Sequence, residues 1–260
     1  MSRKMRDAMS EPDKGAGDAG VSPVVLVHSS DLHIDNDIRP GRYNGLEGLR
    51  YVLAAADTVS ADVVLLAGDT FDNGRVDEAI ARQAGAMLAE VRRPVVMLPG
   101  NHDPALPDGI FHRSGILGLE RTMVIGHTHP EAVLFESLDL EILGRPHVSY
   151  GDMPPLPSVP PRRTRWQVVI AHGHYVPAED WAENAHRSWR ISDADLAATP
   201  VDYIAMGHWD RNEAVGVGSM QAHYSGAPDL AQTVNVVRLC PTNGISISRE
   251  PLRMPFPPRW

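Results

Sequence analysis

The segment VVLVHSSDLH, residues 24–33, runs from apolar, β-branched residues that favour a buried strand directly into Asp31 and His33. The same order recurs four more times, with an apolar run followed at once by Asp, His or Asn. The later runs are 63–66, 95–98, 168–170 and 203–206, and the polar segments after them are 68–72, 100–103, His172 and 207–210. Side chains at the carboxyl ends of neighbouring strands can converge on one point. Carboxylate, imidazole and amide groups gathered there have the composition of a two-metal hydrolytic site.

Length and composition are those of one large domain or two small ones. The chain has 260 residues, and 43% of them are hydrophobic, so it can bury a sizeable core. No run reaches the roughly 18 continuous apolar residues that a membrane span requires. Residues 1–22 carry charges but no apolar stretch typical of a secretory signal. Their Gly, Asp, Ser and Lys content predicts a disordered tail before a domain at 23–260.

Cysteine usage and net charge narrow the setting of the protein. Cys240 is the only cysteine, which excludes an intrachain disulfide and fits a reducing cytoplasm. The formal net charge is −9, and this argues against a chain that binds DNA unaided through a basic face. Two bound divalent ions would offset that charge locally. The basic run 162–165 is interpreted as a solvated loop flank.

The pattern predicts an α/β chain in which strands and helices alternate up to about residue 100 and strands dominate afterwards. Helices are expected at 46–60, 76–90 and 192–198, the last with a capping box formed by Ser192 and Asp195. Strands are expected at 24–28, 63–67, 95–98, 122–125, 132–135, 138–143, 166–171, 203–206, 234–239 and 245–248. The proline-rich segment 153–161 cannot be a helix or an interior strand, and predicts a loop or crossover between halves of one domain.

Three motifs in order, D-x-H at 31–33, G-D-x-x-D at 68–72 and G-N-H-D at 100–103, resemble those of the calcineurin-like metallophosphoesterase superfamily. The resemblance covers roughly residues 23–250. Segments 28–33 and 224–228 are most similar to its double-strand-break repair nuclease branch. The resemblance implies a four-layer αββα sandwich, in which two mixed sheets face each other and helices lie outside.

The resemblance also implies two divalent ions that share Asp69 as a bridging ligand. The implied ligands are Asp31, His33 and Asp69 for the first ion, and Asn101, His172, His208 and Asp69 for the second. His102 would contact the phosphate or protonate the leaving group, and Asp103 would orient His102 by a hydrogen bond. Mixed carboxylate, imidazole and amide ligands favour Mn²⁺, with Fe²⁺ or Zn²⁺ as alternatives.

The last motif departs from the family pattern. The family usually ends with G-H-x-H, whereas this chain has Asp210 at the final position of 207–210. We interpret Asp210 as a replacement ligand for the first ion. A complete G-H-x-H occurs at 126–129, but it precedes His172 in the chain and is interpreted as a surface turn. His172 is preferred over His174 as a ligand because it lies at the strand end.

Other polar residues near these motifs have structural interpretations. Asp72 is expected to stabilise its loop or a neighbouring ligand, and His28 is expected to pack in the core. Gly68 and Gly100 are expected to permit backbone turns beside the ions.

The leading functional prediction is a dinuclear metal-dependent phosphoesterase that hydrolyses phosphodiesters by attack of a metal-bound hydroxide. A DNA exonuclease or endonuclease is one alternative, so nucleic acid remains open as a partner. A binding or scaffold protein that has lost turnover is the other. No membrane association is expected, and the predicted location is cytoplasmic.

Overall fold

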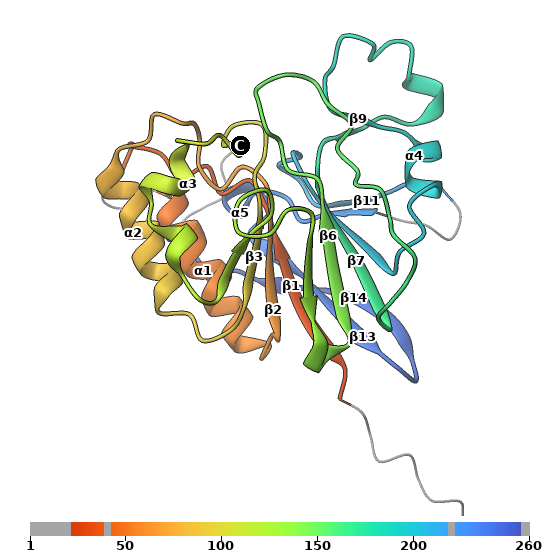
Figure 1. The fold of residues 1–260 in the computed structure, drawn as a ribbon, viewed down its shortest axis with the longest axis horizontal. Coiled ribbons are helices and arrows are strands. Elements are labelled where there is room, and N and C mark those ends of the chain that lie inside the picture. The colour runs from red at the N-terminus through yellow and green to blue at the C-terminus, as the bar shows by residue number, and fades with distance from the viewer. Residues whose placement is uncertain (1–21, 39–42, 218–221, 256–260) are drawn as a thin grey trace, which may run out of the picture.

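The computed structural model describes residues 22–38, 43–217 and 222–255, and almost all of the tail predicted at 1–22 lies outside these residues. Two six-stranded mixed sheets dominate the described part of the chain (Figure 1). The first has the order β14-β13-β1-β2-β3-β4, and the second has the order β11-β12-β10-β7-β6-β5. The predicted α/β architecture of two mixed sheets is therefore confirmed.

The first sheet is parallel in its centre. Strands β1 to β4 run parallel to one another, and β13 is antiparallel to both β1 and β14. The strands are β1 (Val24–Ser29), β2 (Val63–Ala67), β3 (Val95–Leu98), β4 (Thr122–Val124), β13 (Thr233–Cys240) and β14 (Gly244–Pro251). The carboxyl ends of β1, β2 and β3 thus meet at one edge, as the sequence predicts.

The second sheet repeats this arrangement. Strands β6, β7, β10 and β12 are parallel, and β5 and β11 pair antiparallel at the two edges. The strands are β5 (Ala132–Phe135), β6 (Leu140–Gly144), β7 (Trp166–His172), β10 (Tyr203–Gly207), β11 (Glu213–Val215) and β12 (Ala222–Tyr224). A separate small ladder joins β8 (His174–Tyr175) to β9 (Arg190–Ile191).

Helices cover the outer face of the first sheet (Figure 1). The helices are α1 (Gly45–Thr58), α2 (Glu78–Ala89), α3 (Ile110–Arg113), α4 (Asp193–Ala197) and α5 (Pro228–Ala231). Helix α1 begins at the Asn44 cap, whose side chain accepts a hydrogen bond from Glu47 N at 3.0 Å. Its buried face includes Leu46, Leu49 and Val52, as the helical spacing predicts. The predicted capping box of Ser192 and Asp195 on α4 is also confirmed.

Three hydrophobic layers follow from the alternation of side chains along each strand. On β1, Val25 and Val27 pack toward the helices, whereas Leu26 packs between the two sheets. On β7, Val168 lies between the sheets, and Val169 faces the outer side of the second sheet. The central strands are therefore buried on both faces, which explains their continuous apolar runs.

Two predicted features differ from the structure. The proline-rich segment 153–161 is irregular as expected, but it links β6 to β7 within the second sheet and does not join two halves. It is the crossover that adjacent parallel strands require, and Leu156 and Val159 pack on the outer face. The strand expected at 138–143 begins only at Leu140, because 136–138 form a 3₁₀ turn that ends at left-handed Asp139.

Strands β8, β9, β11 and β12 and helices α3 and α5 were not predicted, because each is too short to show a periodic pattern. Within the described residues, no helix combines the length and the apolar character needed to cross a membrane.

We expect Leu65→Ala to lower the free energy of unfolding by about 2–5 kcal/mol, because Leu65 is wholly buried between the two sheets. Leu134→Ala is the matched control, since it removes the same atoms from the exposed side of β5 and should cost only about 0.5 kcal/mol. Urea denaturation of both variants measures the difference. Equal losses would contradict the position of Leu65 in the layer between the sheets.

Candidate metal centre

The loops that follow β1 and β2 pair with each other through their backbones. Asp31 N, His33 N and Ile34 N donate hydrogen bonds to the carbonyl oxygens of Gly68, Asp69 and Thr70, at 3.1, 3.1 and 2.9 Å respectively. This short ladder extends the parallel pairing of the two strands beyond the sheet edge. It holds the predicted ligands Asp31 and His33 beside the predicted bridge Asp69.

Strained backbone conformations mark four of the predicted ligands. Asp31, His33, Asp69 and His208 have φ values of 54°, 47°, 49° and 102°, in the left-handed region that residues with a side chain seldom adopt. Such conformations carry a free-energy cost and persist only where the surrounding structure enforces them. Their concentration at the strand ends indicates that the backbone is bent to aim these side chains at a shared point.

Asp69 lies at the centre of the cluster. Its side chain is only 3% exposed. The Oδ1 atom accepts a hydrogen bond from His102 N at 2.9 Å. The Oδ2 atom lies 3.1 Å from Nε2 of His172 and 3.9 Å from Nε2 of His33. Asp69 therefore contacts histidines that come from both sheets, which is the placement a bridging ligand needs.

Asn101, His172 and His208 form the second side of the cluster. Asn101 Oδ1 lies 2.9 Å from His172 Nε2 and 3.1 Å from His208 Nδ1. His172 Nδ1 donates a hydrogen bond to Ala67 O at 2.8 Å, which fixes the ring orientation and leaves Nε2 directed at the cluster. The backbone N–H of His208 donates to Asp31 Oδ2 at 3.0 Å and ties the two sides together.

The electrostatics of the site are dominated by buried carboxylates. Burial, with a contribution from the Asp69 charge, raises the pKa of Asp31 to about 6 and that of Asp103 to about 8. Burial opposes ionisation of Asp69 as well, but the adjacent His172 outweighs it and lowers the Asp69 pKa. The same pair raises the pKa of His172 to about 9, against the effect of its burial. A cation bound at this point would take the place of the His172 proton and would favour the ionised carboxylates.

The donor set fits two divalent ions that share one carboxylate. Among the described residues, ligand atoms of Asp31, His33 and Asp69 lie within 4.8 Å of one another, and so do those of Asp69, His172 and His208. Asp69 belongs to both groups. Carboxylate and imidazole ligands of this kind suit Mn²⁺, Fe²⁺ and Zn²⁺. The ligands predicted for each ion are thus brought together around the predicted bridge, with Asn101 beside the second group.

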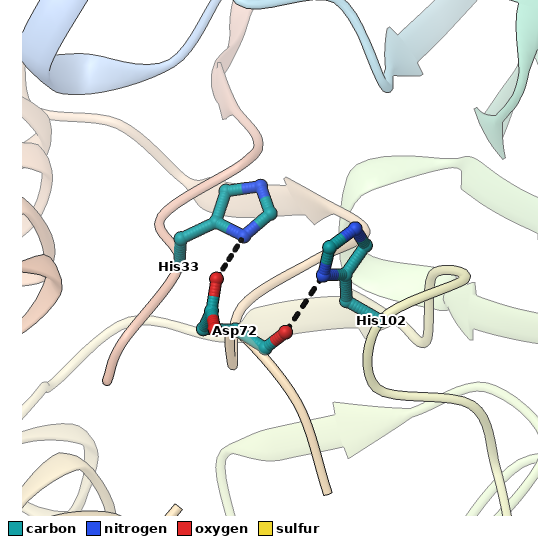
Figure 2. Close-up of side chains that lie close together, drawn as sticks. All are labelled: His33, Asp72 and His102. Carbon is teal, nitrogen blue, oxygen red and sulfur yellow. Dashed lines mark hydrogen bonds and ion pairs between the residues drawn. The ribbon is translucent and has the colours of Figure 1, made fainter. Parts of the chain in front are cut away.

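Asp72 supports two histidines at the rim of the cluster, as Figure 2 shows. Its carboxylate Oδ1 lies 3.2 Å from His33 Nδ1, and its backbone oxygen accepts a hydrogen bond from His102 Nδ1 at 2.7 Å. These contacts orient both imidazoles and agree with the supporting role predicted for Asp72. They are also compatible with a metal-binding group of His33, Asp72 and His102, whose ligand atoms lie within 4.8 Å of one another.

The orienting contact expected between Asp103 and His102 is replaced by a different arrangement. Asp103 is 1% exposed, and its two carboxylate oxygens accept hydrogen bonds from Gly100 N at 2.7 Å and Phe71 N at 3.0 Å. His102 is exposed, and its ring is held by the Asp72 backbone. Asp103 lies beneath the loop, so it stabilises the backbone that carries Asn101 and His102 rather than the imidazole ring.

Asp210 lies at the open side of the centre. It is exposed and lines a pocket of about 230 Å³ together with Asp31, His33 and Asp72. Its backbone oxygen accepts a hydrogen bond from Ala227 N at 2.8 Å, so the late segment 224–228 positions this loop. The pocket gives Asp210 access to the first-ion side, although it is not part of the tight ligand groups.

The remaining histidines occupy structural positions. The G-H-x-H at 126–129 is a tight turn in which Gly126 N donates to His129 O at 2.6 Å, as predicted. His28 is wholly buried and its Nδ1 lies 2.9 Å from the Tyr203 hydroxyl, which confirms its predicted core position. His174 lies outside the ligand groups and accepts a hydrogen bond from the Trp209 indole at 3.0 Å.

Two contributors to the site were missed by sequence reasoning. His147 is wholly buried, and its Nε2 donates a hydrogen bond to the backbone oxygen of His172 at 2.9 Å. Ser225 bonds through its hydroxyl to that of Ser30 at 2.9 Å, next to Asp31. His147 belongs to no motif, so only its tertiary contact reveals it. Ser225 lies in the segment 224–228 that carries the repair-nuclease resemblance, and this was the available signal.

Comparisons with known proteins agree with this geometry. Residues 24–212 match the family model for calcineurin-like phosphoesterases. One subunit of the nuclease SbcCD of Bacillus subtilis (strain 168) is 24% identical over 241 residues, which are 78% of this chain and 61% of that protein. The chain therefore spans about three fifths of the length of this curated relative.

Solved structures share the fold at low sequence identity. A candidate 5′-nucleotidase from Staphylococcus aureus superposes with a TM-score of 0.57 at 12% identity, covering 89% of this chain and 54% of that chain. The protein TT1561 of Thermus thermophilus superposes with a TM-score of 0.55 at 10% identity, covering 89% of this chain and 100% of that chain.

We expect Gly68→Ala to weaken metal binding at the second ion while the protein stays folded. Gly68 has a φ of 91°, and a Cβ atom there would overlap the His172 ring, so the imidazole must move. Gly118→Ala is the control, since a Cβ at Gly118 meets no atom within 4 Å. Elemental analysis after metal loading, together with circular dichroism, measures the outcome. Full metal content in folded Gly68→Ala protein would contradict the position of His172 at the centre.

Proposed function

Because the chain belongs to the calcineurin-like phosphoesterase family, we propose that it hydrolyses phosphodiesters with two divalent cations held on either side of Asp69. The observation that carries the proposal is the pair of ligand groups that share this one buried carboxylate. Two such ions, when bound, would neutralise the phosphate, stabilise the entering and leaving oxygens, and lower the pKa of a water molecule.

The protein residues would divide the work between holding the ions and handling the substrate. Asp31 and His33 would hold the first ion with Asp69, and His172 and His208 would hold the second. The neutral amide of Asn101 would add a ligand to the second ion without adding negative charge. The mixed oxygen and nitrogen donors favour Mn²⁺ over Mg²⁺, which prefers oxygen ligands.

His102 is suited to contact the substrate. Its ring is exposed beside the cluster, and its Nδ1–H donates to the Asp72 backbone oxygen. This contact leaves Nε2 free to face a bound ester. In the protonated ring, Nε2–H would hydrogen bond to a phosphate oxygen or donate a proton to the leaving oxygen. Asp103 would serve this step indirectly, by fixing the loop that carries His102.

A nuclease is the second candidate function. It is favoured by the sequence similarity to the Bacillus subtilis nuclease. The net charge of −9 favours a smaller phosphodiester, because unaided DNA binding normally uses a basic surface. Binding of single- and double-stranded DNA at increasing salt concentration distinguishes the two candidates, since a DNA-binding surface loses affinity steeply as salt rises.

We expect exhaustive chelation to abolish hydrolysis of an aryl phosphodiester and added Mn²⁺ to restore it, because the site depends on buried carboxylates that a cation must neutralise. The assay compares bis(4-nitrophenyl) phosphate, 4-nitrophenyl phosphate, and single- and double-stranded DNA with the same metal-loaded protein. Full activity in protein shown by elemental analysis to be free of metal would refute the proposal.

We expect Asp69→Ala to remove turnover more completely than His102→Ala. Loss of the shared carboxylate should release or scatter both ions, whereas loss of His102 should leave the ions bound. The second change should lower kcat by about 10²–10⁴-fold, the range typical of general acid–base groups. Metal content and kcat of the two variants measure the contrast, and full metal occupancy in Asp69→Ala would argue against a shared ligand.

We expect Asp210→Ala to weaken the first ion selectively and Asp210→His to restore it, because Asp210 lines the pocket that contains Asp31 and His33. Metal titration by calorimetry measures both affinities. His129→Ala is the control, since this histidine belongs to the turn after β4 and should leave both affinities unchanged. A silent Asp210→Ala, paired with metal loss in His129→Ala, would reverse the assignment.

A further inference from the structure

A cavity of about 1170 Å³ adjoins the candidate metal centre. His208 and Asp210 contribute to its wall, so it lies beside the predicted ligands of both ions. Ligand pockets for small molecules usually enclose about 300–1,000 Å³. The cavity therefore has room for an organic group attached to a phosphate that is bound at the centre.

The Trp209 indole is a rigid part of the cavity wall. Its Nε1–H donates a hydrogen bond to His174 Nδ1 at 3.0 Å, and one face of the ring stacks on Tyr224 at 4.5 Å with an interplanar angle of 6°. Tyr224 is wholly buried, and its hydroxyl donates to Gly173 O at 2.7 Å. The indole is thus held in place before any ligand arrives, so little conformational entropy is lost on binding.

A flat cationic group already lies against this indole. The Arg211 guanidinium is 5.3 Å from the centre of the Trp209 ring. The Arg211 side chain is 75% exposed, and its partner Glu213 lies at the surface at 2.9 Å. Exposed ion pairs of this kind contribute little to stability, so Arg211 can move aside at small cost. Both indole and guanidinium groups stack favourably on the planar bases of nucleotides.

We propose that Trp209 binds a nucleobase of the phosphodiester substrate by stacking, so that the substrate is a nucleotide ester. This inference rests on the proposed phosphodiesterase function and assigns the substrate class. Because Trp209 is flanked in sequence by His208 and Asp210, a stacked base would belong to the nucleoside attached to the reacting phosphate. The wall also carries Arg187 and Asn212, so it suits a polar planar group better than an acyl chain.

The test compares two diesters with the same chromogenic leaving group: thymidine 5′-(4-nitrophenyl phosphate) and methyl 4-nitrophenyl phosphate. The readout is the selectivity, defined as the ratio of kcat/KM for the nucleoside ester to kcat/KM for the methyl ester. Wild-type protein loaded with Mn²⁺ should prefer the nucleoside ester by about 5- to 150-fold, the range that base–aromatic stacking supplies.

The Trp209→Ala change should reduce the selectivity to near one, and Trp209→Phe should keep it within about threefold of wild type because a stacking ring remains. Trp181→Ala is the matched control. Trp181 is an indole of the neighbouring segment that packs under Arg190 at 4.1 Å and is not part of the cavity wall, so its loss should leave the selectivity unchanged. Elemental analysis of each variant ensures that the ions are still bound.

The outcomes separate the two levels of the proposal. Hydrolysis of neither ester by the metal-loaded wild type would overturn the proposed function, and the stacking site with it. Hydrolysis of both esters with a wild-type selectivity near one would overturn the stacking site alone. The same conclusion would follow if Trp209→Ala, with its metal content intact, kept the wild-type selectivity.

Discussion

Three carboxylates buried close together, those of Asp31, Asp69 and Asp103, are the constraint on which the rest of the site depends. Each is almost inaccessible to water, and like charges in such a place repel. Within the described residues, His172 supplies the compensating imidazolium for Asp69. Backbone N–H groups of Gly100, Phe71 and His208 serve the other two carboxylates. An assembly of this kind is costly for stability alone, and its donor set is that of a cation site.

The fold meets this constraint by joining two sheets at their carboxyl ends. β1, β2 and β3 bring the acidic loops, and β7 and β10 bring the two histidines from the facing sheet. The approach is so close that glycine is required at the contact points. A Cβ at Gly207 would overlap the Ala67 carbonyl oxygen, and a Cβ at Gly100 would overlap the Asp69 carboxylate. These glycines permit the backbone of one loop to rest on the side chains of another.

Burial divides the centre into an inner and an outer part. Asp69 and His172 are enclosed and tightly paired, which suits residues that hold ions in fixed geometry. His102 and Asp210 are exposed at the rim, and the large cavity with Trp209 in its wall begins beside them. This division follows from the layers of the fold, because the strand ends are covered and only the loops beyond them reach solvent. It places the proposed substrate contacts on loops and the proposed ion ligands on the sheet edges.

Sequence alone determined the α/β class, the five central strands and the convergence of Asp31, Asp69, Asn101, His172 and His208. It could do so because strand burial and the position of a residue at a strand end are local properties that an apolar run and its first polar residue display directly. Only the tertiary structure decided that Asp103 supports a backbone loop, that His147 holds the His172 carbonyl, and that Trp209 forms a cavity wall on Tyr224. These contacts join residues from different loops and strands through side-chain directions that no periodic pattern encodes. They are consequences of how the two sheets pack against each other.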